Sequence, residues 1–298
     1  MAETSINSVP KEKFLPRVGE SQRFTRVLFS RWWVILGVII ILLLILTAIF
    51  APLIAPYGPN LTNLEIARQQ PSSHHLLGTD ELGRDVLSRI IYGSRISIII
   101  GVIVVSVSGT VGMLLGLFAG YFRGWVEVIV MRSIDALMSI PPLILMLAIA
   151  VMLGPGLFNI ILSLSIGLLP TYTRLVYGQI LSAKENDYVM AANVIGAGNF
   201  RIMFSHLVPN IFPPIFVNIT LNLGFAILAE ASLSFLGIGI GPPTATWGAM
   251  INSGERFLLT NPLLSVAPGI AIVLTVLAFN LVGDGLRDAL DPKLRGII

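Results

Sequence analysis

Residues 187–210 read DYVMAANVIGAGNFRIMFSHLVPN, a polar, glycine-punctuated stretch between two long apolar runs. The pattern predicts a short helix over 187–195 that ends at Gly196 and Gly198, because glycine adopts left-handed backbone conformations cheaply and so terminates helices. A second helical stretch then leads through 200–208 to Pro209 and into the next apolar run. In a membrane protein, a compact helix–glycine–helix on one side of the bilayer offers a docking element to a partner in water. The alternative is an ordinary loop between two helices.

The composition indicates that most of this chain lies in lipid. Apolar residues make up 55% and charged residues 12% of the 298 residues, and the mean hydropathy is +0.86. These values are typical of a multispanning membrane protein rather than a globular enzyme. There is no cysteine, which excludes disulfides and thiolate metal sites. The adjacent His74 and His75 are expected to be a solvated loop pair, with metal binding as the alternative.

Six apolar runs are long enough to cross a membrane, since a helix needs roughly 20 residues to traverse about 30 Å of hydrocarbon. We expect these spans at residues 33–54, 96–119, 134–153, 157–176, 210–233 and 263–282. The first run is too long for a cleavable signal peptide and follows a polar tail. The predicted fold is therefore an all-α, six-span integral membrane protein.

The positive residues predict the orientation of the spans. If the N-terminus lies inside, fourteen of the nineteen Lys and Arg residues fall on the inner side. The five on the outer side are Arg68, Arg84, Arg89, Arg95 and Arg256. Because Lys and Arg are enriched in cytoplasmic loops, both termini and the loop over 182–208 are predicted to be cytoplasmic. The small net charge of +3 thus reflects topology and gives no indication of nucleic-acid binding.

The chain divides into a polar tail, residues 1–30, which is predicted to be cytoplasmic, and one six-span membrane domain, residues 31–298. Residues 21–31 mix basic and apolar side chains ahead of Trp32 and Trp33. That pattern suits an interfacial helix with an aromatic anchor, and its cations can meet anionic membrane lipid.

The loop after the first span contains a second distinctive stretch, HLLGTDELGRDVLSRIIYGSRIS at residues 75–97. Thr79 is suited to cap a helix, and apolar residues recur at helical spacing after it. We therefore expect an amphipathic helix over about 80–93, lying on the outer membrane face or against the bundle.

These two stretches resemble motifs of known transport proteins. Residues 75–97 are similar to the LGTDxLGRDxxSRxxxGxRxS signature of the dipeptide/oligopeptide-type permeases of ATP-binding-cassette importers. The matched residues are Gly78, Thr79, Asp80, Leu82, Gly83, Arg84, Asp85, Ser88, Arg89, Gly93, Arg95 and Ser97. Residues 187–210 resemble the EAA loop of such permeases at Ala191, Ala192, Gly196 and Pro209. Met190 stands where that motif begins with Glu, a departure that removes a possible polar contact.

The resemblance implies a type I importer permease of the second, "C" type. Its implied partners are a homologous sister permease, two cytoplasmic ATPase subunits and an extracytoplasmic solute-binding protein, in a bacterial or archaeal cytoplasmic membrane. The short helix would be the coupling helix that docks on an ATPase, so Ala191→Arg or Gly196→Trp should uncouple ATP hydrolysis from transport. The implied docking residues are Asp187, Tyr188, Met190, Ala191, Ala192, Gly196, Ala197 and Pro209.

No nucleotide-binding motif of the form G-x-x-x-x-G-K-[ST] occurs in this chain. ATP and magnesium are therefore expected on the partner ATPases. We expect this subunit to be non-catalytic, with no catalytic residue, cofactor or metal site of its own.

Polar groups at membrane depth suggest where a transport path runs. Asn218, Asn222 and Asn280 fall within predicted spans, where polar side chains face the protein interior or a wet cavity. They are candidates for the translocation path, and interhelical hydrogen bonding is the alternative. Prolines 141–142, 170 and 213–214 are predicted hinge points or simple packing kinks. Gly112 and Gly116 form a small-xxx-small pair suited to close helix packing.

The predicted function is translocation of di- or oligopeptides across the cytoplasmic membrane by alternating access, driven by the separate ATPases. Glutathione and a nickel or other metal–chelate are alternative substrates within the same class. A secondary transporter or channel is a more distant alternative, and a structural membrane anchor is a third. Neither of these last two classes requires the 187–209 loop.

Overall fold

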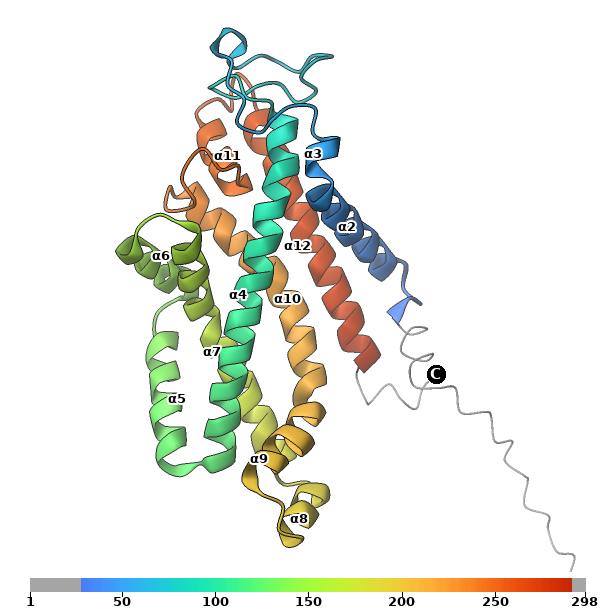
Figure 1. Ribbon diagram of the computed structural model, residues 1–298, viewed down its shortest axis with the longest axis vertical. Helices are drawn as coiled ribbons and strands as arrows, with labels where there is room; N and C mark the ends of the chain where they lie inside the picture. The colour runs from blue at the N-terminus through green and yellow to red at the C-terminus, as the bar shows by residue number, and fades with distance from the viewer. Residues whose placement is uncertain (1–27, 291–298) are drawn as a thin grey trace, which may run out of the picture.

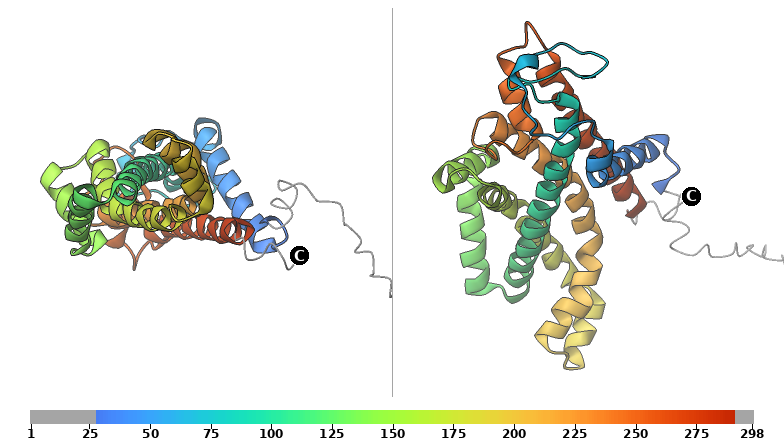
Figure 2. Two further views of the ribbon diagram at one scale, coloured as in Figure 1. Left: turned by 90° about the horizontal axis from the view of Figure 1, so that it is seen from below. Right: turned by 45° about the horizontal axis from the view of Figure 1, so that its top comes forward.

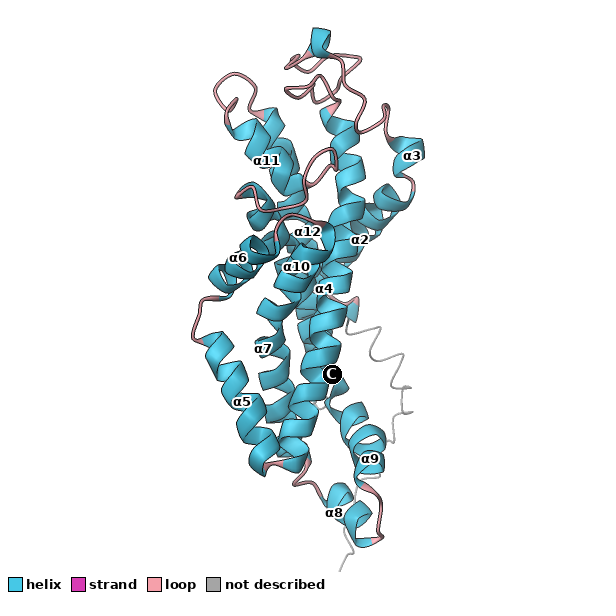
Figure 3. Ribbon diagram, turned by 60° about the vertical axis from the view of Figure 1, so that its left-hand side comes forward, coloured by secondary structure: helices cyan, strands magenta, loops and turns pink. Residues whose placement is uncertain are grey.

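The computed structural model describes residues 28–290, and the predicted cytoplasmic tail up to residue 27 lies outside them. The described chain is built from helices, with only an isolated bridge between Thr79 and Asp85 (Figure 3). In chain order they are α2 (Trp32–Ile49), α3 (Ala51–Ile54), η1 (Leu64–Ile66), α4 (Val86–Phe122), α5 (Gly124–Met138), α6 (Pro142–Leu153), α7 (Leu157–Ala183), α8 (Asp187–Val194), α9 (Asn199–Arg201), η2 (Ile202–Leu207), α10 (Val208–Phe235), α11 (Trp247–Glu255) and α12 (Leu263–Leu290).

The long helices pass back and forth along one axis of the molecule (Figure 1). α4, α7 and α12 run down in that view, α5 and α10 run up, and the loop around α8 lies at the lower end. Five stretches are long and apolar enough to span a membrane, and the α5–α6 pair makes a sixth if it is one broken span. Arg31 at the start of α2 pairs with Asp288 near the end of α12 at 2.5 Å, which brings the two ends of the described chain together. The six-span, all-α prediction is confirmed in this form.

The third span differs from the straight helix predicted over 134–153. The helical path begins earlier, at Gly124, and α5 and α6 meet at an angle of 92°. The break falls at Ser139–Pro141, directly before Pro142, and proline cannot donate the backbone hydrogen bond that would continue the helix. The proline pair at 141–142 therefore marks the bend itself.

The α4–α7 pair forms the centre of the bundle, and glycines allow its close approach. A side chain at Gly112 would press against Tyr172 Cβ at 2.6 Å, and one at Gly116 would press against the Thr173 carbonyl oxygen at 2.5 Å. Gly120 meets Ile180 in the same way, one turn further on. Small residues at such positions let two membrane helices pack with their backbones nearly touching. The predicted packing role of Gly112 and Gly116 is confirmed.

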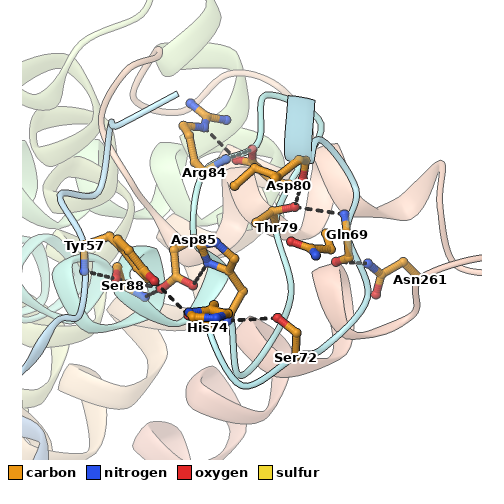
Figure 4. Close-up of polar contacts among 12 residues, drawn as sticks. Tyr57, Gln69, Ser72, His74, Thr79, Asp80, Arg84, Asp85, Ser88 and Asn261 are labelled. Atoms are coloured by element: carbon orange, nitrogen blue, oxygen red, sulfur yellow. Dashed lines mark hydrogen bonds and ion pairs between the residues drawn. The ribbon is translucent and has the colours of Figure 1, made fainter. Parts of the chain in front are cut away.

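The predicted amphipathic helix over 80–93 is wrong. Residues 80–85 form a loop, and the helix beginning at Val86 is the first part of the 37-residue α4. The N-cap is Asp85, whose Oδ2 accepts hydrogen bonds from the Ser88 amide at 2.8 Å and the Ser88 hydroxyl at 2.7 Å. Thr79 instead holds the loop together, since its hydroxyl donates to the Ile66 carbonyl and accepts from the Gln69 amide (Figure 4).

His75 is buried and is not the solvated side chain that was expected. Its Nδ1 lies 2.9 Å from Asp85 Oδ1, and the Tyr57 ring packs on it with centroids 4.8 Å apart. The imidazole therefore links the loop to the start of α4 through the capping carboxylate. Sequence spacing did not predict this contact, because the two residues are ten positions apart along a loop.

Candidate functional site at the α8 tip and the α10 groove

α8 is an eight-residue helix whose end is fixed by backbone geometry. Gly196 has φ +78°, its amide donates to the Asn193 carbonyl at 3.0 Å, and the Ala197 amide donates to the Ala192 carbonyl at 3.0 Å. These two bonds form a Schellman motif, which needs a left-handed residue and so favours glycine. The chain turns sharply there and re-enters a helix at Asn199. The predicted helix and its glycine stop are confirmed.

One face of α8 packs inward. Val189 and Ala192 are buried in an apolar cluster with Ile180, Ile202 and Met203. These contacts tie α8 both to the end of α7 and to the π-helical turn η2 that leads into α10. α8 is thus held in a defined orientation against the bundle.

The other face of α8 is exposed and largely apolar, with Asp187 and Asn193 as its polar residues. Val194 is 86% exposed and Ile195 is 83% exposed, and Tyr188, Met190 and Phe200 are exposed beside them. Figures 2 and 3 show that this part of the chain projects below the ends of the long helices. We call the exposed surface of residues 187–200 the α8 tip. An apolar patch of this kind on a projecting element is typical of a protein–protein contact.

Two polar contacts join the base of the tip to the end of α4. Lys184 Nζ donates to the Tyr121 carbonyl oxygen at 2.6 Å and lies 4.9 Å from the centre of the Tyr121 ring. The Tyr121 hydroxyl in turn donates to Asn199 Oδ1 at 3.0 Å. Partial burial and the charge of Arg123 hold the pKa of Lys184 below its usual value. None of these contacts was predicted, since each joins residues at least 63 positions apart.

The structure does not bring all of the residues proposed for docking to one surface. Asp187, Tyr188, Met190, Ala191 and Gly196 are exposed on the α8 tip. Ala192 is buried, so it packs α8 onto the bundle and presents nothing to a partner. Ala197 is half-buried against the same cluster. Pro209 lies beyond η2, on the wall of a separate groove.

That groove, which we call the α10 groove, lies between α7, α10 and α12 and has a volume of about 700 Å³. Its polar lining consists of Gln179, Asn210, Asn218 and Arg287. Asn218 also accepts hydrogen bonds from Asn222 Nδ2, at 2.9 Å through its backbone carbonyl and 2.5 Å through its side chain. Asn280 is exposed on α12 and is not part of the groove lining.

The neighbouring α5 is attached to α7 by two polar pairs. Arg174 donates to Asp135 Oδ1 at 2.6 Å, and the Tyr177 hydroxyl donates to Glu127 Oε1 at 2.5 Å. Asp135 also lies 3.9 Å from Arg132. A movement of the lower half of α7 would therefore carry α5 with it.

Comparison with known proteins agrees with these features. Residues 112–296 match the family described as binding-protein-dependent transport system inner membrane component. Residues 21–71 match the N-terminal TM domain of oligopeptide transport permease C. The chain therefore belongs to the binding-protein-dependent inner membrane permease family, whose members are non-catalytic subunits of ATP-binding-cassette importers.

Curated relatives cover nearly the whole chain. A dipeptide transport system permease protein DppC from Alkalihalophilus pseudofirmus is 40% identical over 97% of this chain and 95% of its own length. A probable D,D-dipeptide transport system permease protein DdpC from Escherichia coli K12 is 43% identical over 87% of both chains. A glutathione transport system permease protein GsiD from Pectobacterium atrosepticum is 43% identical over 86% of this chain and 85% of its own.

Proposed function

We propose that this chain is the "C"-type permease of an importer for di- or oligopeptides, and that the α8 tip is where an ATPase subunit docks. The observation that carries the docking assignment is the exposed apolar face of α8, held in place by its buried face and its Schellman turn. A projecting apolar surface is costly in water and is stabilised when a partner covers it. Peptide as the substrate is supported by the names of several relatives.

The α8 tip lies in the cytoplasm in this proposal. The positive-residue bias of the loops favours that side, and an ATPase that uses cellular ATP must be there. The start of α2 and the end of α12 then lie toward the cytoplasm, and the loop containing His75 and Asp85 lies outside. The membrane is that of a bacterial cell, as it is for the relatives named above.

The mechanism is alternating access in a complex with a homologous sister permease, two ATPase subunits and a solute-binding protein. ATP binding closes the ATPase pair and moves the α8 tip. Lys184 and Tyr121 pass that movement to α4, and the buried cluster passes it to α10. Asn218, Asn222 and Asn280 lie along the path that opens, because polar side chains at membrane depth require protein or water partners.

Glutathione is the second candidate substrate. It is a short peptide, and one relative of equal identity is named as a glutathione permease. Both substrates have a free carboxylate and an amide backbone, so the same hydrogen-bonding groups of the permease can bind either one. The choice between them rests with the binding protein in this proposal.

The test is purification of the tagged chain from its native membrane in mild detergent, followed by mass spectrometry of the proteins recovered with it. We expect a sister permease and one or two ATPases, and ATP-driven peptide uptake after reconstitution with the binding protein. Recovery of this chain alone, under conditions that trap nucleotide, would contradict the proposal.

A further inference from the structure

The α10 groove combines a cation with neutral hydrogen-bonding groups. Arg287 lies on its α12 wall, and the amides of Gln179, Asn210 and Asn218 lie on its α7 and α10 walls. Arg287 forms no ion pair with any residue in the described range 28–290. The neighbouring acid, Asp288, is already paired with Arg31.

The α10 wall also has backbone acceptors that its own helix leaves without a donor. Pro213 and Pro214 have no N–H, so the carbonyls of Pro209 and Asn210, four residues earlier, lose their usual helical donors. All four of these residues line the groove. Carbonyl groups freed in this way need water, a side chain or a ligand as a hydrogen-bond partner.

The polar residues of α10 extend inward from the groove. Asn210, Asn218 and Asn222 recur at multiples of four residues, with Pro214 between them, so they share one stripe of the helix. The stripe covers twelve residues, or about 18 Å of rise. Amides in such a row would be costly against lipid tails, so the stripe faces an aqueous space or protein.

We propose that the α10 groove binds the ends of a short zwitterionic peptide as it passes through the permease. Arg287 holds the terminal carboxylate, because a guanidinium can donate two parallel hydrogen bonds to a carboxylate. The carbonyls of Pro209 and Asn210 accept hydrogen bonds from the terminal ammonium or the peptide N–H. The side-chain amides of the groove form hydrogen bonds with the peptide backbone between its two ends. The volume of about 700 Å³ suits a small ligand. This inference rests on the proposed import of peptides.

The absence of cysteine from this chain allows a direct test by thiol labelling. Asn218→Cys would be placed in the complete importer, reconstituted in phosphatidylcholine vesicles with cysteine-free partner subunits. Its rates of reaction with an anionic and a cationic methanethiosulfonate reagent would be measured. Leu259→Cys is the control, because Leu259 is fully exposed in the loop between α11 and α12 and lies outside the groove.

We expect the groove thiol to react faster with the anionic reagent, and Arg287→Gln to remove that preference by several-fold while Arg287→Lys retains most of it. Dialanine should slow labelling at Asn218→Cys, and dialanine amide, which has no carboxylate, should slow it much less. The Arg287→Gln variant should lose this difference. Labelling of Leu259→Cys should respond to neither peptide.

Three results would overturn the inference. The thiol could be inaccessible to both reagents, or dialanine and its amide could protect it equally. Protection by phosphatidylglycerol in the vesicles, with no effect of peptide, would assign the groove to an anionic lipid headgroup instead. ATP-driven uptake measured in the same vesicles separates the two proposals, because uptake without carboxylate-dependent protection contradicts only the groove assignment.

Discussion

Lys184 Nζ lies 2.6 Å from the carbonyl oxygen of Tyr121, and this contact joins the residue after α7 to the last turn of α4. Lys184 is three residues before the start of α8, so the contact fixes the base of the α8 tip. The Tyr121 hydroxyl reaches Asn199 on the other side of the tip. The tip is therefore connected to the bundle at both of its ends through one tyrosine.

Lys184→Met should weaken the connection between the tip and α4. Methionine keeps much of the length of lysine but cannot donate, and a hydrogen bond to a charged group contributes roughly 1.5–3 kcal/mol. We expect fewer peptides imported per ATP hydrolysed, with the complex still assembled. Tyr121→Phe is the comparison variant, because it keeps the carbonyl and the ring and loses only the bond to Asn199. If Lys184→Met imports as many peptides per ATP hydrolysed as the wild type, this contact does not transmit the movement of the tip to α4.

Gly116→Ala should destabilise the bundle. The added methyl would meet the Thr173 carbonyl oxygen at 2.5 Å and Val176 Cβ at 2.8 Å, and overpacking of this kind costs about 1–3 kcal/mol. Gly178→Ala is the matched control in α7, where a Cβ meets nothing within 4 Å. There alanine should be neutral or stabilising by up to about 1 kcal/mol, because it favours the helix. Thermal loss of soluble complex in detergent measures both variants, and equal midpoints would contradict the packing analysis.

Asp85→Ala should loosen the outer loop. The change removes the N-cap of α4, worth about 1 kcal/mol, and leaves the buried His75 and Ser88 without their shared acceptor. Asp85→Asn keeps acceptor oxygen and should be intermediate. Glu81→Ala is the control, since Glu81 is exposed in the same loop. Limited proteolysis from the outer side should cut residues 55–85 fastest in Asp85→Ala, and a rate equal to that of Glu81→Ala would refute the capping role.

The sequence was sufficient to predict the spans and the α8 tip because both depend on local patterns. Apolar runs of about 20 residues need only be counted, and a glycine after a short helix marks its end wherever that helix packs. The predicted bounds of the helices were wrong where tertiary contacts or a proline determine where a helix begins or bends. α4 starts at Val86 because Asp85 caps it, and the third span bends by 92° before Pro142.

The contacts that build the candidate site could not be predicted from the sequence. Lys184 and Tyr121 are 63 residues apart, and no sequence periodicity predicts to which backbone carbonyl a lysine donates a hydrogen bond. The inward orientation of Ala192 also depends on η2 and α7, which pack against it. From the sequence, Arg287 served only as a positive charge that indicates topology, because its place in the same groove as Asn218 follows from the packing of α12 on α10.

The central claim is that the α8 tip couples ATP hydrolysis to transport, and Ala191→Arg tests it most directly. Ala191 is exposed on the tip, so arginine there fits the fold but charges the docking surface, whereas Gly196→Trp would also strain the Schellman turn at φ +78°. Leu259→Arg, at a fully exposed apolar residue between α11 and α12, is the control.

The measurement is the number of peptides imported per ATP hydrolysed in proteoliposomes at equal membrane abundance. We expect Ala191→Arg to lower this ratio at least about tenfold, equivalent to roughly 1.4 kcal/mol of lost coupling, and Leu259→Arg to leave it unchanged. A wild-type ratio in Ala191→Arg would contradict docking at the α8 tip.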